Sequence, residues 1–337
     1  MVLRNDKEVK MKKFLAALLT LMLVLGMSIS AFADDPAAPQ DAEEVTITKS
    51  YKAANGGVSP AEEFSFSELT CTSVTDAAEG VTRFNAPVPE IGTVSFAEGD
   101  ATAEGTEKTA TITLPEYTSV GVYTYTFTED SSAKTAGVTY FEDEITLVVT
   151  VIEQDGKVRV AAVHCEGSDG TDKTDKFENI YESGTLQVTK EVTGNMGDQS
   201  KYFDVTVTFT PADGETINST IKYSGGSKYT SEVTVKNNTA TIQVKHGETV
   251  TFTNIPEGVT WAVEEADYSE DGYDAAQYSQ ASDTMGAGTA AACTITNNKE
   301  NEIDTGISMD SLPYIVMIAV VVIAAAAFFM KRRNSAE

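Results

Sequence analysis

Basic residues are scarce in this chain of 337 residues. Against 51 Asp and Glu there are only 24 Lys and Arg, which leaves a formal net charge of −27. Phosphate binding needs clustered Lys and Arg, so this balance argues against a nucleic-acid partner. Acidic charge of this size keeps an exposed protein soluble, but it does not identify a ligand.

Histidine and cysteine are scarcer still. Two histidines and three cysteines cannot make an ordinary zinc site together, and His164 and His246 stand alone. The sequence has neither a nucleophile elbow nor a His-based triad, so we expect no enzyme, no metal and no cofactor. The odd number of cysteines argues against a full disulfide framework. It leaves open whether Cys71 and Cys165 pair or are simply small buried residues.

Long amphipathic helices are missing between the two ends of the chain. Short runs rich in Thr, Val, Ile, Tyr and Phe alternate there with period two, and Gly, Asp, Asn and Pro separate them. This pattern is typical of antiparallel strands with one buried face, and many such strands at regular spacing indicate β-sandwiches. The clearest runs are 45–49, 110–114, 122–128, 145–152, 203–210 and 240–244.

Long apolar runs occur only near the ends. Residues 14–29 follow a Met-Lys-Lys start and precede Ala31-Phe32-Ala33, which predicts a secretory signal peptide. We therefore assign residues 1–33 to an N-terminal extension with a signal peptide, and residues 34–43 to a flexible leader. The second run, 312–330, is long enough for a transmembrane helix, and the basic cluster behind it should stay on the cytoplasmic side.

The chain also repeats itself in a fixed order. Each half has a strand that carries a Lys, then a Gly-Val strand that ends in Glu, then a last strand that carries an Asn. Three matches in one order are much stronger than any single match. The matching pairs are VTITK at 45–49 with LQVTK at 186–190, GVYTYTFTED at 121–130 with GVTWAVEEAD at 258–267, and FEN at 177–179 with ITN at 295–297. We therefore expect two domains, 44–182 and 183–300, before a C-terminal segment, 301–337.

These features resemble the self-cross-linking Ig-like domains of Gram-positive pilins and adhesins. In that family a Lys in the first strand and an Asn in the last strand form an isopeptide bond, and a Glu in a central strand assists the reaction. The stretch 246–259 (HGETVTFTNIPEGV) is similar to the Gly-x-x-x-x-Phe-x-Asn-Leu-Pro-x-Gly stretch that precedes the glutamate strand in this group. The resemblance is closest to two-domain backbone pilins of the streptococcal T-antigen type. It implies an all-β chain of two tandem Ig-like (CnaB-type, Greek-key) β-sandwich domains.

The resemblance also implies the reacting residues. The isopeptide bonds would join Lys49 to Asn179 and Lys190 to Asn297, with Glu129 and Glu265 as the catalytic groups of the autocatalytic reaction. Burial would favour a neutral, nucleophilic amine and a protonated carboxyl. The alternative is that all six are ordinary surface residues of β-strands.

Neighbouring residues leave some of these positions ambiguous. Lys52 could replace Lys49, Glu264 could replace Glu265, and Asn298 could replace Asn297. Successive side chains of a strand point to opposite faces. Val263 shares a face with Glu265, and Ile295 shares one with Asn297. Strand parity therefore favours Glu265 and Asn297.

The C-terminal segment resembles a cell-wall sorting signal. In that family a sortase cuts between the Thr and Gly of Leu-Pro-x-Thr-Gly and joins the Thr to an amine. Here the pentapeptide is Glu-Ile-Asp-Thr-Gly, so the cut would fall between Thr305 and Gly306. It looks closer to the Glu-Val-Pro-Thr-Gly of some pilus backbone proteins. Lys173 is the candidate acceptor lysine, and Lys176 is the alternative.

The resemblance thus implies a structural pilus subunit on the surface or cell wall of a Gram-positive bacterium. Its partners would be a sortase and identical subunits in a covalent fibre, and it would meet the membrane only through the C-terminal segment before sorting. The alternative is an anchored adhesin or minor pilin that presents a ligand-binding surface. A host surface ligand stays open in either case.

Overall fold

The computed structural model describes residues 42–167, 176–301 and 314–323. The predicted signal peptide, the candidate acceptor Lys173 and the pair Thr305-Gly306 lie outside these ranges. Residues 314–323 are helical, and the rest of the predicted span 312–330 also falls outside them. In the part of the chain that is described, no helix has the length and apolar character needed to cross a membrane.

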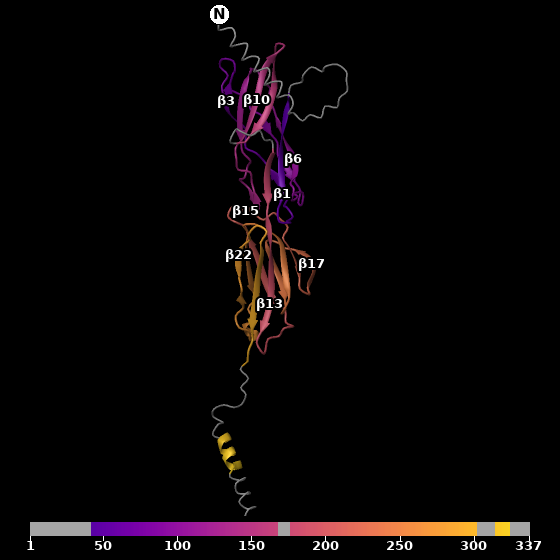
Figure 1. The fold of residues 1–337 in the computed structure, drawn as a ribbon, viewed down its shortest axis with the longest axis vertical. Helices are drawn as coiled ribbons and strands as arrows, with labels where there is room; N and C mark the ends of the chain where they lie inside the picture. Colours follow the sequence, from indigo (N-terminus) through magenta and orange to yellow (C-terminus); the bar gives the residue numbers. More distant parts are fainter. Residues whose placement is uncertain (1–41, 168–175, 302–313, 324–337) are drawn as a thin grey trace, which may run out of the picture.

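The first domain is built from strands β1 to β12, which form two main sheets (Figure 1). One sheet has the order β4-β6-β1-β12-β9, and the other has the order β11-β10-β7-β3. The strands β2 and β5 make a separate pair. The bounds are β1 Glu44–Ala53, β2 Glu62–Phe64, β3 Thr70–Thr75, β4 Glu90–Ile91, β5 Val94–Phe96, β6 Thr106–Thr113, β7 Gly121–Phe127, β8 Lys134–Thr135, β9 Val138–Thr139, β10 Ile145–Gln154, β11 Lys157–Glu166 and β12 Lys176–Tyr181.

The second domain repeats this plan with strands β13 to β23. Its sheets have the orders β17-β16-β19-β13-β23-β21 and β18-β14-β20-β22. A 3-10 turn, η1, spans Ser269–Asp271. The bounds are β13 Ser183–Thr193, β14 Phe203–Thr210, β15 Glu215–Thr216, β16 Lys222–Gly225, β17 Tyr229–Thr234, β18 Thr239–Val244, β19 Thr249–Pro256, β20 Thr260–Glu265, β21 Gln277–Tyr278, β22 Ser282–Thr284 and β23 Ala290–Asn298.

The alternating runs in the sequence produce these strands, as predicted. In β7, β10 and β14 every second side chain is buried, so each strand turns one face to the opposite sheet. Two large hydrophobic clusters result, one within residues 47–181 and one within residues 186–295, which Ala136 also joins. The all-β prediction is confirmed. Cys71 is a free, buried thiol, so the pairing with Cys165 that the sequence left open is not formed.

The first and last strands of each domain lie side by side and run parallel. In the first domain β1 pairs with β12 so that Lys49 lies opposite Phe177, two residues before Asn179. In the second domain β13 pairs with β23 so that Lys190 lies opposite Ile295, again two residues before an asparagine. Side chains two residues apart share a face of a strand. In each domain this offset therefore points the lysine and the asparagine into the core of that same domain.

The two domains are joined end to end (Figure 1). β12 continues almost directly into β13, and β8 of the first domain pairs with β15 of the second. Asn254, from the NIP stretch singled out in the sequence, lies at this junction with φ of 59°. Its Oδ1 accepts from the Val58 N–H (2.9 Å) and the Tyr181 hydroxyl (3.2 Å), and its Nδ2 donates to the carbonyls of Val58 (3.0 Å) and Thr220 (3.2 Å).

Candidate isopeptide sites

The first site is assembled by three strands of the first domain. β1 supplies Lys49, β12 supplies Asn179, and the chain just after β7 supplies Glu129. All three are buried, with relative exposures of 0, 0 and 5%. Charged residues are almost never buried this fully unless they are paired, so the burial calls for a specific set of contacts.

The three side chains form a closed triangle of polar contacts. Lys49 Nζ donates to Asn179 Oδ1 at 2.6 Å and also contacts Glu129 Oε2. Asn179 Nδ2 donates to Glu129 Oε1 at 2.5 Å. The amine is therefore within reach of the amide carbonyl, and one carboxyl group bridges the attacking nitrogen and the nitrogen that would leave.

Burial sets the protonation states of this triangle. Loss of water lowers the pKa of Lys49, which the nearby charge of Glu129 opposes. The same loss of water raises the pKa of Glu129, against the pull of Lys49 and of the hydrogen bond from Asn179. Both shifts favour the neutral amine and the protonated carboxyl, the pair of states in which the amine is a nucleophile and the acid can donate a proton.

A backbone group completes the first site. The N–H of Phe141 donates to Asn179 Oδ1 at 3.1 Å, so the carbonyl oxygen accepts two hydrogen bonds. This donor could not be predicted from the sequence. A main-chain N–H has no residue type that would signal it.

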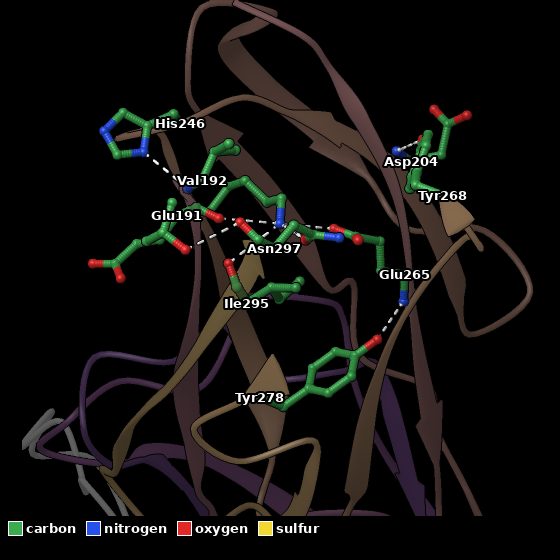
Figure 2. A network of polar contacts seen from close by, with 11 residues as sticks. Glu191, Val192, Asp204, His246, Glu265, Tyr268, Tyr278, Ile295 and Asn297 are labelled. Atoms are coloured by element: carbon green, nitrogen blue, oxygen red, sulfur yellow. Dashed lines mark hydrogen bonds and ion pairs between the residues drawn. The ribbon is translucent and has the colours of Figure 1, made fainter. Parts of the chain in front are cut away.

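The second site has the same three residue types as the first, but their contacts differ. Lys190 and Asn297 are 0 and 1% exposed, and the side chain of Glu265 is fully buried. Lys190 Nζ contacts Asn297 Oδ1, lies 3.0 Å from Glu265 Oε2, and also donates to the carbonyls of Glu191 (3.3 Å) and Ile295 (3.4 Å). Burial lowers the pKa of Lys190, and the charge of Glu265 opposes that shift. Figure 2 shows Asn297 and Glu265 turned toward each other.

The neighbouring candidates stay outside both sites. Lys52 is half-buried and pairs with Glu178 at 2.7 Å. Glu264 is exposed, one residue before the buried Glu265. Asn298 bonds to Asp274 at 2.9 Å on the surface. The structure therefore brings together the six residues that the resemblance implied and leaves their neighbours apart.

Comparisons with known proteins fit this arrangement. Residues 45–182 match the family described as the Spy0128-like isopeptide containing domain, and residues 184–299 match a domain of unknown function, DUF7601. A pilin of Streptococcus pyogenes serotype M1 is 28% identical over an alignment of 331 positions, and the match covers 88% of this chain and 94% of that protein.

Solved structures show the same fold. The major pilin from Streptococcus pyogenes is 23% identical with a TM-score of 0.56, covering 78% of this chain and all of that one. The T3.2 major pilin of the same species is 20% identical with a TM-score of 0.54, covering 77% and 99% of the two chains. The chain is therefore a homologue of a Streptococcus pyogenes pilin over most of its length, and its residues 45–182 match an isopeptide-containing domain.

Proposed function

We propose that this pilin is a shaft subunit in which each Ig-like domain is closed by one Lys–Asn isopeptide bond and successive subunits are joined by a sortase. One observation carries the proposal. A buried Lys, Glu and Asn meet between the first and last strands of both domains. The similarity to pilins over most of the chain favours a shaft subunit over an adhesin.

The geometry supports a single-turnover reaction within the folded chain. In the first domain the lone pair of Lys49 Nζ attacks Asn179 Cγ, and the C=O π pair moves onto Oδ1. One Nζ proton passes through Glu129 to Nδ2. The Cγ–Nδ2 bond then breaks and ammonia leaves, while Glu129 regains its starting protonation state. Folding holds amine and amide at a very high effective concentration, which supplies most of the rate.

The strand order explains what such a bond does under tension. The chain enters each domain by its first strand and leaves by its last, and the bond would join those two strands. Lys49 and Asn179 are 130 residues apart in sequence, and Lys190 and Asn297 are 107 residues apart. Force would pass from one cross-link to the next through residues 179–190. The segments of chain between the bonded residues, which include most of the strands of each domain, would carry none of the force.

Joining of subunits is the second part of the proposal. A sortase would cut between Thr305 and Gly306 and transfer Thr305 to a lysine of the next subunit, with Lys173 as the preferred acceptor. Thr305 follows the last strand of the second domain by only seven residues. The alternative acceptor, Lys176, lies at the start of β12 and donates to Glu107 at 2.5 Å. The fibre would be displayed at the Gram-positive cell wall.

The mass of the protein tests the cross-links directly. The fragment from Asp34 to Glu300, made without a sortase, should weigh about 34 Da less than its sequence, because each bond releases one ammonia of about 17 Da. Lys49→Ala and Lys190→Ala should each halve the deficit. Lys52→Ala, a matched lysine of the same first strand, should leave it unchanged. A mass equal to that of the sequence would refute the proposal.

A further inference from the structure

The two sites differ in how they treat the carbonyl that is attacked. In the first domain Asn179 Oδ1 accepts from Lys49 Nζ and from the Phe141 N–H. As the new bond forms, Lys49 Nζ becomes bonded to Cγ and stops donating to that oxygen. The Phe141 N–H, at 3.1 Å, is then the remaining donor aimed at the atom where negative charge develops.

Three contacts hold that N–H in place before any reaction. β9 pairs with β12, which sets Thr139 opposite Ile180 just ahead of the donor. The Tyr140 hydroxyl accepts from the Thr135 N–H at 3.1 Å and donates to Glu62 Oε2 at 3.3 Å. The Phe141 ring packs edge-on against Phe177, with ring centres 5.1 Å apart. A donor fixed in this way costs no reorganisation at the moment of reaction, which is the condition for strong stabilisation of an oxyanion.

The second domain has no counterpart to this donor. Within residues 176–301, Asn297 Oδ1 accepts from Lys190 Nζ and from no backbone N–H. β21 takes the place of β9 beside the last strand, but Tyr278 uses its hydroxyl to accept from the Glu265 N–H at 2.9 Å (Figure 2). The Lys190 amine also donates to two backbone carbonyls. These hydrogen bonds favour the protonated form of the amine over the neutral, nucleophilic form.

We propose that the Phe141 backbone N–H is an oxyanion donor for the cross-linking reaction, and that the Lys49–Asn179 bond therefore forms ahead of the Lys190–Asn297 bond. The inference rests on the proposed function. In the tetrahedral intermediate the former π pair sits on Oδ1 beside this N–H. It returns to form the new amide carbonyl when the Cγ–Nδ2 bond breaks and ammonia leaves.

Two variants of Phe141 separate the effect of losing the backbone N–H from the effect of losing the ring. Phe141→Ala and Phe141→Pro both lose the contact with Phe177, and only the proline variant also loses the N–H. The full chain is synthesised in a cell-free reaction without sortase, sampled into acid over time, and digested. The two cross-linked peptides have different masses, so each bond is followed separately. The second bond reports on synthesis and folding in the same molecules.

We expect the proline variant to form the first bond about 100-fold more slowly than the alanine variant, as for loss of one oxyanion donor, with the second bond unchanged. Equal rates in the two variants would overturn the inference. Should proline unfold the first domain, the unmodified chain decides: appearance of the Lys49–Asn179 peptide first supports the inference, and the reverse or simultaneous order overturns it. Absence of both peptides in the unmodified chain would instead sink the proposed function.

Discussion

Replacing Glu129 by Gln should separate the effect of the cross-link from that of the core around it. Gln has nearly the shape of the protonated Glu, but it cannot carry a proton from Lys49 to Asn179. The side chain is fully buried, and its carboxyl group makes polar contacts with Lys49 and Asn179, so a side chain of the same shape should leave the packing of the core little changed. We expect a folded domain without the bond.

The expected loss of stability follows from the length of the loop. The bond closes a loop with a sequence separation of 130 residues, and constraining such a loop in the unfolded state contributes about 5 kcal/mol to the free energy of unfolding. For a domain of this size that corresponds to a decrease in Tm of about 15–20 °C, at roughly 3–4 °C per kcal/mol. The unreacted Lys49 left in the core would add to the loss, because burial lowers its pKa and disfavours its charged form.

Calorimetry of the purified fragment, with its intact mass measured in parallel, tests this estimate. Glu178→Gln is a matched control: Glu178 is the neighbour of Asn179 and pairs with Lys52 on the surface. It should keep both bonds and change Tm by only a few degrees, since exposed ion pairs contribute about 0–1 kcal/mol. If Glu129→Gln lacks one bond by mass yet melts within about 5 °C of the unmodified protein, loop constraint is not what stabilises the domain.

Three further results are expected. Between pH 7 and 9 the Tm of Glu129→Gln should rise toward that of the cross-linked protein: burial lowers the pKa of the free lysine, so the unfolded chain binds more protons than the folded one. A constant gap between the two melting curves would contradict this. Asn254→Ala should keep the full mass deficit but speed hydrogen exchange at Val58, because it strips partners worth about 1–3 kcal/mol from the junction; unchanged exchange would show that the junction does not depend on Asn254. In the host, Thr305→Ala should abolish high-molecular-weight ladders in cell-wall extracts and Lys173→Ala should reduce them, whereas undiminished ladders in Thr305→Ala would exclude it as the joining residue.

Much of this molecule could be predicted from local patterns. Alternation with period two reports which side of a strand faces the core, because it depends only on neighbours along the chain. The same parity distinguishes Glu265 from Glu264, and the structure buries the first and exposes the second. The repeated order of Lys, Glu and Asn pointed to six residues that the fold brings together in two groups.

Only the tertiary structure decided how each group is arranged. The parallel pairing of first and last strands sets the two-residue offset between Lys and Asn, and it joins segments more than 100 residues apart. The donor at Phe141 is a main-chain N–H, which every residue except proline possesses, so no residue type in the sequence indicates it. Asn254 likewise stood in a recognisable stretch of sequence, but its partners at Val58 come from the other domain. Local alternation is encoded residue by residue, whereas contacts between distant segments exist only once the sheets have paired.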